Sequence, residues 1–172
     1  MKKSILLSFL ILSVFSSFAQ PQKWAVGFEV GEPIGVSLRK YGDRNALDIS
    51  VGTYVGFFKN KENYKVSNDD MGNIGIMFNA TYLWYVPFFN DRMIAYAGPG
   101  LQVNSRRYYP DRNVKSVHTT NISTGPSGTA GLEFFFAQKP ASFFVEGGGY
   151  LELIPKFFYF NPMLSLGLRH NF

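Results

Sequence analysis

Few residues of this 172-residue chain are suited to metal or acid–base chemistry. Cysteine is absent, and the only imidazole groups are those of His118 and His170. Protein zinc sites combine several cysteine, histidine and carboxylate ligands, yet neither histidine has a second histidine or a cysteine beside it. We therefore expect no metal centre and no cofactor.

The acidic and basic residues of the apolar segments follow a regular pattern. Successive side chains of a strand alternate between its faces, and these charges fall opposite the more apolar row, among many glycines. The narrow lumen of a small barrel needs small residues beside a few mutually paired charges. We predict a lumen charge network of seven residues, in which Glu146 pairs with Arg169: Glu29, Arg39, Asp48, Glu133, Glu146, Glu152 and Arg169.

Eight alternating segments separated by turn residues must position these charges. They cover residues 24–30, 34–38, 47–57, 72–86, 93–104, 127–136, 142–152 and 162–172. No segment has a helical period, and the connections alternate between short and mostly long. The pattern predicts an all-β fold, an eight-stranded antiparallel up-and-down transmembrane β-barrel. We expect Pro99 to mark a bulge or an end of regular pairing, because proline cannot donate to a ladder.

The first nineteen residues have the pattern of a secretory signal peptide. Lys2 and Lys3 precede an apolar run, and residues 17–19 form a small-x-small cleavage site. We predict a signal peptide at 1–19 and one barrel domain at 20–172. Removal of the two lysines lowers the formal net charge from +5 to +3, which does not favour nucleic-acid binding. A lipoprotein is excluded because its acyl anchor requires a cysteine.

The positions of the aromatic residues distinguish a membrane barrel from a soluble one. With the N-terminus periplasmic, the eight segments place two groups at opposite rims: Trp24, Trp84, Phe88, Phe89, Phe136, Phe143 and Phe172 at the periplasmic rim, and Phe57, Phe58, Phe157, Phe158 and Tyr159 at the outer rim. Two aromatic bands are typical of membrane interfaces. A soluble periplasmic β-barrel that binds an apolar ligand is the alternative, and it would scatter aromatic residues along the strands.

The last eleven residues, P-M-L-S-L-G-L-R-H-N-F, resemble the terminal targeting strand of bacterial outer-membrane β-barrels. The family pattern of a polar residue, glycine, an apolar residue and a terminal aromatic falls on Ser165, Gly167, His170 and Phe172, with His170 departing from it. The resemblance implies that Gly167 and Phe172 form an assembly signal. It also implies insertion by the outer-membrane barrel assembly machinery.

A second stretch resembles a group of small, porin-like bacterial outer-membrane β-barrel proteins. It is the Gly-x-Pro-x-Gly turn at 31–35, followed by a strand that ends in a basic residue and an aromatic, and then by Ala-Leu-Asp. This resemblance implies a monomer in the outer membrane, in contact with lipid and lipopolysaccharide. It indicates a fold and a location rather than a reaction, so we expect a structural or interaction role. An eight-stranded barrel also leaves no wide channel for a general porin.

One enzymatic alternative comes from His118. The run His-Thr-Thr-Asn at 118–121 resembles the His-x-Ser-Asn motif of outer-membrane lipid A deacylases. That resemblance would assign catalytic roles to His118 and Glu133, although threonines replace the family's serine. The predicted inward orientation of Glu133 opposes the assignment, because the chemistry would have to occur on the lipid face.

A basic segment gives the last candidate site. We predict a long polar loop over residues 105–126, which carries Arg106, Arg107, Arg112 and Lys115. Such a loop is suited to contact lipopolysaccharide phosphates or an acidic partner. The alternative is a solvated loop without a dedicated ligand.

Overall fold

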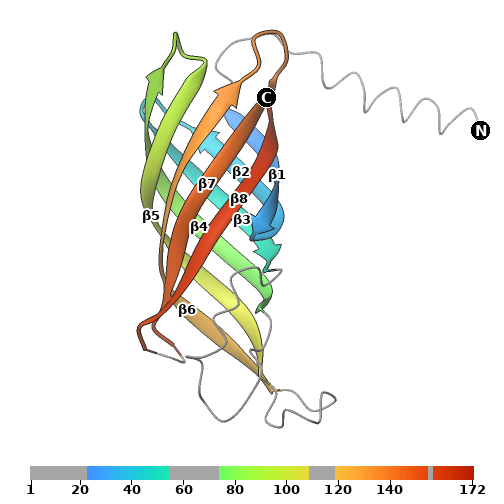
Figure 1. Ribbon diagram of the computed structural model, residues 1–172, viewed down its shortest axis with the longest axis vertical. Helices are drawn as coiled ribbons and strands as arrows, with labels where there is room; N and C mark the ends of the chain where they lie inside the picture. The colour runs from blue at the N-terminus through green and yellow to red at the C-terminus, as the bar shows by residue number, and fades with distance from the viewer. Residues whose placement is uncertain (1–22, 55–73, 109–118, 155–156) are drawn as a thin grey trace, which may run out of the picture.

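The strands of the protein close into one barrel. The computed structural model describes residues 23–54, 74–108, 119–154 and 157–172, and its eight strands follow one another around a closed sheet (Figure 1). They are β1 (Trp24–Glu32), β2 (Ile34–Tyr41), β3 (Asn45–Thr53), β4 (Ile74–Phe88), β5 (Met93–Tyr108), β6 (Thr119–Phe135), β7 (Ala141–Glu152) and β8 (Tyr159–Asn171). The predicted eight-stranded antiparallel barrel is confirmed. No helix among the described residues is long and apolar enough to cross a membrane.

The terminal strand closes the barrel against the first one. β8 pairs antiparallel with β1 from Ala25↔Asn171 to Glu32↔Leu164. At the rim, Trp24 N–H donates to the Phe172 carbonyl at 3.1 Å, and Phe172 N–H donates back to Trp24 at 2.8 Å. Because the strand number is even, the start of β1 and the end of β8 share one rim, called here the terminal rim.

The hairpin between β1 and β2 is tight. At the opposite rim, β1 and β2 are joined through Pro33 alone. Gly31 takes a φ of 140° there, and a Cβ at this position would overlap the carbonyl oxygen of Leu164. Only glycine fits such a close approach of two strands without strain.

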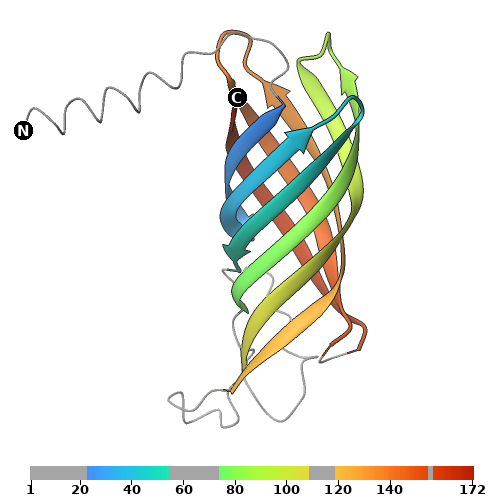
Figure 2. The ribbon, with the colours of Figure 1, turned by 180° about the vertical axis from the view of Figure 1, so that it is seen from behind.

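The hairpin of β5 and β6 extends far beyond the other strands at that opposite rim (Figures 1 and 2). Its pairing continues from Met93↔Phe134 to Tyr108↔Thr119. The predicted polar loop over 105–126 is therefore wrong for much of its length. Backbone hydrogen bonds do not depend on side-chain polarity, so the absence of an alternating apolar pattern did not reveal these strand ends.

Pro99 forms no bulge, but regular pairing with one neighbouring strand is interrupted beside it. It lies within β5 opposite Gly128 of β6, with continuous register on that side. Against β4, the pairing skips Gly98 and Pro99, but the register is the same on either side of them, at Thr81↔Gly100 and at Trp84↔Ala97. A proline on the outer surface is therefore accommodated without a shift of strand alignment.

Several predicted features lie outside the described residues. They are the signal peptide at 1–19, the aromatic residues Phe57 and Phe58, and the candidate residues Arg112, Lys115 and His118.

Candidate functional site

The polarity of the barrel is inverted relative to a water-soluble protein. Its outer surface exposes large apolar side chains on every strand, among them Phe28, Leu38, Val51, Phe78, Leu101, Leu132, Val145, Leu166 and Leu168. The buried side chains are mostly polar or charged, among them Ser37, Ser50, Asn79, Thr81, Gln102, Asn104, Ser123 and Ser165. The same alternation therefore produces an apolar exterior and a polar lumen.

Arg39 lies at the centre of a buried group of charges. Its side chain is 1% exposed, and its guanidinium contacts three carboxylates. Nε donates to Asp48 Oδ2 at 2.6 Å, Nη1 to Glu133 Oε2 at 3.1 Å, and Nη2 to Glu146 Oε1 at 2.8 Å. All three distances are within the range of charge-assisted hydrogen bonds or close to it.

Arg169 binds the same acids from β8. Its Nη2 donates to Glu146 Oε1 at 2.5 Å, and its Nη1 donates to Glu133 Oε2 at 3.3 Å. The guanidinium lies 3.5 Å from the centroid of the Phe144 ring. We call Arg39, Asp48, Glu133, Glu146 and Arg169 the ion-pair cluster.

Register accounts for only part of the ion-pair cluster. Arg39 is the direct cross-strand partner of Asp48, but Glu146 is opposite Ser165 and Arg169 is opposite Ser142. Arg169 and Glu146 meet diagonally on the neighbouring strands β8 and β7, and the other contacts run across the lumen between strands that are not neighbours. Long arginine side chains make this reach feasible, and their fork-shaped donors match several carboxylates at once.

Glycine provides the room that these side chains occupy. A Cβ at Gly27 would lie 2.9 Å from Arg169 Cγ and 2.6 Å from Ser37 Oγ. A Cβ at Gly131 would lie 2.6 Å from the Tyr96 hydroxyl oxygen. The glycines of the inner face are thus matched to the bulky residues beside them.

Two tyrosines complete the ion-pair cluster, and sequence reasoning missed both. The Tyr41 hydroxyl is 2.9 Å from both carboxylate oxygens of Glu133, and the Tyr96 hydroxyl donates to Glu146 Oε1 at 2.6 Å. Ser142 also donates to Glu133. Tyr41 lies beyond the predicted segment 34–38, although it continues the inward alternation of Ser37 and Arg39, and that alternation is the available signal.

Glu29 and Glu152 lie outside the ion-pair cluster. Glu152 is fully buried on β7, towards the opposite rim. Glu29 is 3% exposed and accepts a hydrogen bond from Ser165 at 3.4 Å on Oε2. Its Oε1 has no hydrogen-bond partner among the described residues. The structure therefore gathers five of the seven predicted residues into one cluster and leaves these two apart.

The remaining candidate residues are dispersed. Glu133 is fully buried, and Arg106 and Arg107 lie in β5 rather than in a loop. The His170 ring stacks against Phe172 at 6.5 Å with an interplanar angle of 21°. Within the described ranges, no three His, Cys, Asp or Glu side chains are grouped to hold a metal ion.

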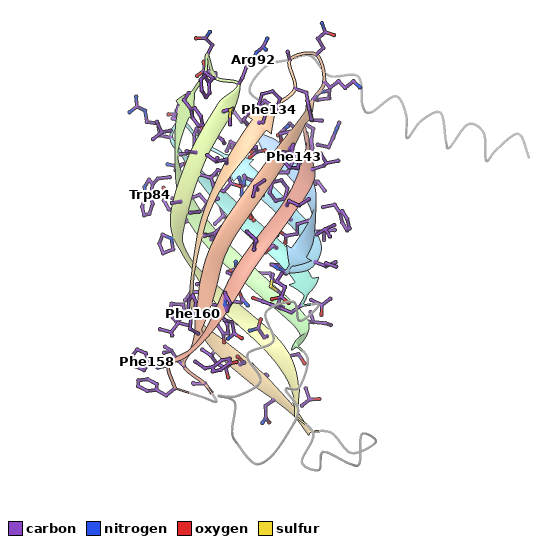
Figure 3. The ribbon with its side chains drawn as sticks, in the orientation of Figure 1. Trp84, Arg92, Phe134, Phe143, Phe158 and Phe160 are labelled. Atoms are coloured by element: carbon purple, nitrogen blue, oxygen red, sulfur yellow. The ribbon has the colours of Figure 1, made fainter. Side chains whose placement is uncertain are left out.

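Aromatic side chains mark both ends of the outer surface. Phe134 and Phe143 point outward near the terminal rim, whereas Phe158 and Phe160 project near the opposite rim (Figure 3). Lys40 adds a cation–π contact at the terminal rim, with Nζ 5.2 Å from the Trp24 ring centroid. The prediction for Tyr159 is wrong, because its side chain is buried while that of Phe160 is 56% exposed. Alternation places only one of these two neighbours outside.

Fold and polarity together define a small eight-stranded β-barrel with a charged lumen. The sequence matches no protein-family model, and no curated protein matches it at a significant level. Solved structures of similar fold include the N-terminal β-barrel domain of Pseudomonas aeruginosa OprF, at 16% identity and a TM-score of 0.63, covering 89% of this chain and 100% of that one. Neisserial surface protein A is also similar, at 13% identity and a TM-score of 0.54, covering 87% and 93% of the two chains. These similarities concern the fold.

Proposed function

We propose that this chain is an integral protein of the bacterial outer membrane with a structural or interaction role. One observation carries the proposal: large apolar side chains cover the outer surface while charged and polar side chains are buried inside. A closed sheet satisfies every backbone polar group internally, which a lipid environment requires. The same surface in water would be an unusually large exposed apolar patch.

The arrangement of the lumen favours a structural role over bulk transport. The ion-pair cluster joins side chains from β2, β3, β6, β7 and β8 across the interior. Paired charges that fill the interior of a small barrel hold its strands together and leave no wide aqueous path. Lipid and lipopolysaccharide are the expected surroundings of the outer surface.

Two features of the terminal strand support insertion into the outer membrane by the barrel assembly machinery. Gly167 has a packing role of its own, because a Cβ there would overlap the Phe28 carbonyl oxygen and approach the Phe144 ring to 2.6 Å. Phe172 is 51% exposed at the terminal rim. An inner position with room only for glycine, followed by an exposed terminal aromatic residue, is consistent with recognition by the barrel assembly machinery.

The described contacts do not favour the lipid-hydrolase alternative. Glu133 accepts hydrogen bonds from Tyr41, Ser142 and both arginines inside the barrel, so its carboxylate is not available at the lipid face. Replacement of His118 by alanine provides the test. A change in lipid A acylation, measured by mass spectrometry against wild type and a strain without the protein, would restore the enzymatic assignment.

Membrane fractionation combined with heat-modifiable gel migration tests the location. We expect recovery in the outer-membrane fraction and a mobility shift on boiling, because folded membrane barrels resist detergent. Recovery in the soluble periplasm would overturn the proposal in favour of a soluble barrel.

A charge on the outer surface gives a sharper test. We expect Leu166→Arg, near the middle of β8, to destabilise the lipid-embedded barrel by about 2–4 kcal/mol, and Val86→Arg, near the terminal rim, by about 0–1 kcal/mol. Urea unfolding in lipid vesicles measures both. Equal effects of the two substitutions would contradict a lipid-facing surface.

A further inference from the structure

The carboxylates of the lumen outnumber its positive charges. Around the ion-pair cluster, four carboxylates face two guanidinium groups, those of Arg39 and Arg169: Glu29, Asp48, Glu133 and Glu146. A buried carboxylate without a compensating charge is strongly disfavoured. The described part of the lumen therefore requires additional positive charge, supplied by a bound cation or by a proton on one carboxylate.

Glu29 forms no ion pair with Arg39 or Arg169. Both guanidinium groups are engaged with Asp48, Glu133 and Glu146 at 2.5–3.7 Å. Among the described residues, no ion pair within 4.0 Å involves Glu29, whose hydrogen-bonded contact is the 3.4 Å interaction with Ser165. Its Oε1 is buried and has no hydrogen-bond partner there.

This oxygen belongs to a residue that lines an internal cavity. The cavity has a volume of about 30 Å³, whereas one water needs roughly 10–15 Å³ by the same measure. A small ion with one or two waters therefore fits. The polar lining comes from Glu29, Ser50, Asn79, Thr81, Thr129 and Ser165, and Arg39, Asp48 and Glu146 of the ion-pair cluster border the same space.

The oxygen-rich lining selects the class of ligand. Carboxylate, hydroxyl and amide oxygens suit hard cations, and the lining holds no thiolate and no imidazole, the ligands that transition metals favour. Calcium sites usually combine several carboxylates, whereas the described residues hold no group of three acidic or imidazole side chains arranged for a metal ion. Asp48 and Glu146 are already paired with Arg39, so Glu29 is the one lining carboxylate without an ion pair among the described residues, and a single positive charge matches it.

We propose that this cavity binds a monovalent metal cation, sodium or potassium, with Glu29 as its charged ligand and neighbouring hydroxyl and amide oxygens completing the shell. The cation supplies positive charge that the two arginines do not. The site goes beyond the proposed membrane function and does not depend on it, since the lumen is the same in micelles and in a bilayer.

Cation-dependent unfolding tests the proposal. The folded chain in an uncharged maltoside detergent is unfolded with urea in sodium, potassium or N-methylglucamine chloride at equal ionic strength and mildly alkaline pH. A ligand that binds only the folded state stabilises it in proportion to the logarithm of its concentration above Kd. We expect a higher urea midpoint in sodium or potassium than in the bulky organic cation, and loss of that difference in Glu29→Gln. Asp43→Asn, which removes an exposed carboxylate from a turn, should retain it.

Three results would overturn the cation site. Equal midpoints in the three salts would show that no small cation binds. Retention of the difference in Glu29→Gln would place the ion elsewhere. A midpoint that changes with pH but not with the identity of the cation would show that Glu29 takes up a proton instead.

A direct measurement covers the case in which Glu29→Gln does not fold. Crystals of the wild-type protein soaked in thallium(I), which substitutes for potassium, should give an anomalous-scattering peak in the cavity beside Glu29. A cavity without such a peak would contradict the proposal irrespective of the variant.

Discussion

Two adjacent regions of the lumen differ in the hydrogen bonds that their carboxylates receive. In the ion-pair cluster, Glu146 receives hydrogen bonds from Arg39, Arg169 and Tyr96. In the cavity beside it, Glu29 receives one long hydrogen bond from Ser165. The two acids have the same chemistry and both lie in the lumen, with Glu29 3% exposed and the Glu146 side chain 12% exposed, so the main difference lies in their neighbours.

This difference separates a structural acid from one that is available for binding. A carboxylate whose lone pairs are satisfied by arginine holds strands together, and its removal leaves the arginines uncompensated. A carboxylate without such a partner adds little to stability and attracts an external positive charge. The same glutamate-to-glutamine substitution should therefore destabilise the barrel more in the ion-pair cluster than in the cavity.

Loss of Arg39 should have the largest effect. Arg39→Met preserves much of the side-chain volume but leaves Asp48, Glu133 and Glu146 without their shared donor. Breaking a buried ion pair by removing one partner costs about 3–5 kcal/mol, and we expect a decrease in the free energy of unfolding of that size.

Urea unfolding in detergent micelles measures this change. Arg44→Met is the matched control, because Arg44 is exposed in the turn between β2 and β3, and it should shift stability by about 0.5 kcal/mol or less. Equal losses for the two variants would mean that the ion-pair cluster contributes nothing to stability.

Glu146→Gln should rank second. The amide keeps one acceptor oxygen but loses the negative charge that offsets Arg39 and Arg169, so we expect a loss of about 2–3 kcal/mol. The comparison is with Glu29→Gln under identical sodium chloride conditions. Similar losses for the two variants would refute the distinction between the regions.

Removal of the Tyr96 hydroxyl should have an intermediate effect. Tyr96→Phe deletes a 2.6 Å hydrogen bond to Glu146, and a hydrogen bond to a charged group contributes about 1.5–3 kcal/mol. We expect a loss of stability near the lower limit of this range, because both arginines still donate hydrogen bonds to Glu146. Tyr82→Phe is the control on the outer surface, where Tyr82 is 44% exposed, and its unfolding midpoint should barely change.

Alternation of side chains explains how much of the fold could be predicted. The strand number, the antiparallel order and the inward orientation of the charged residues all follow from a period of two within segments bounded by turns. The ends of β5 and β6 could not be predicted, because beyond Asn104 the hairpin continues through polar residues that carry no apolar row. Backbone hydrogen bonds hold those strand ends together, and no alternating apolar residues mark them in the sequence.

The identity of the inward residues was predictable, but their partners were not. Arg39 and Asp48 meet as direct cross-strand neighbours. Contacts across the lumen, such as Arg39 with Glu133 or Tyr41 with Glu133, depend on the tilt and closure of the barrel, which relate strands that are remote in sequence. The isolation of Glu29 follows from the same geometry and has no signature in the sequence.

Glu29→Gln should have the smallest effect in sodium chloride, a change of about 1 kcal/mol or less in the free energy of unfolding. Loss of the bound cation and relief of an uncompensated buried charge oppose each other in that medium. In N-methylglucamine chloride only the second effect remains, so the variant should become more stable than the wild type, by an amount on the order of 1 kcal/mol. Paired urea titrations of the two proteins in both salts measure this reversal. A variant that is less stable than the wild type by the same margin in both media would show that Glu29 is a structural acid like Glu146, held by contacts within the barrel rather than by an ion.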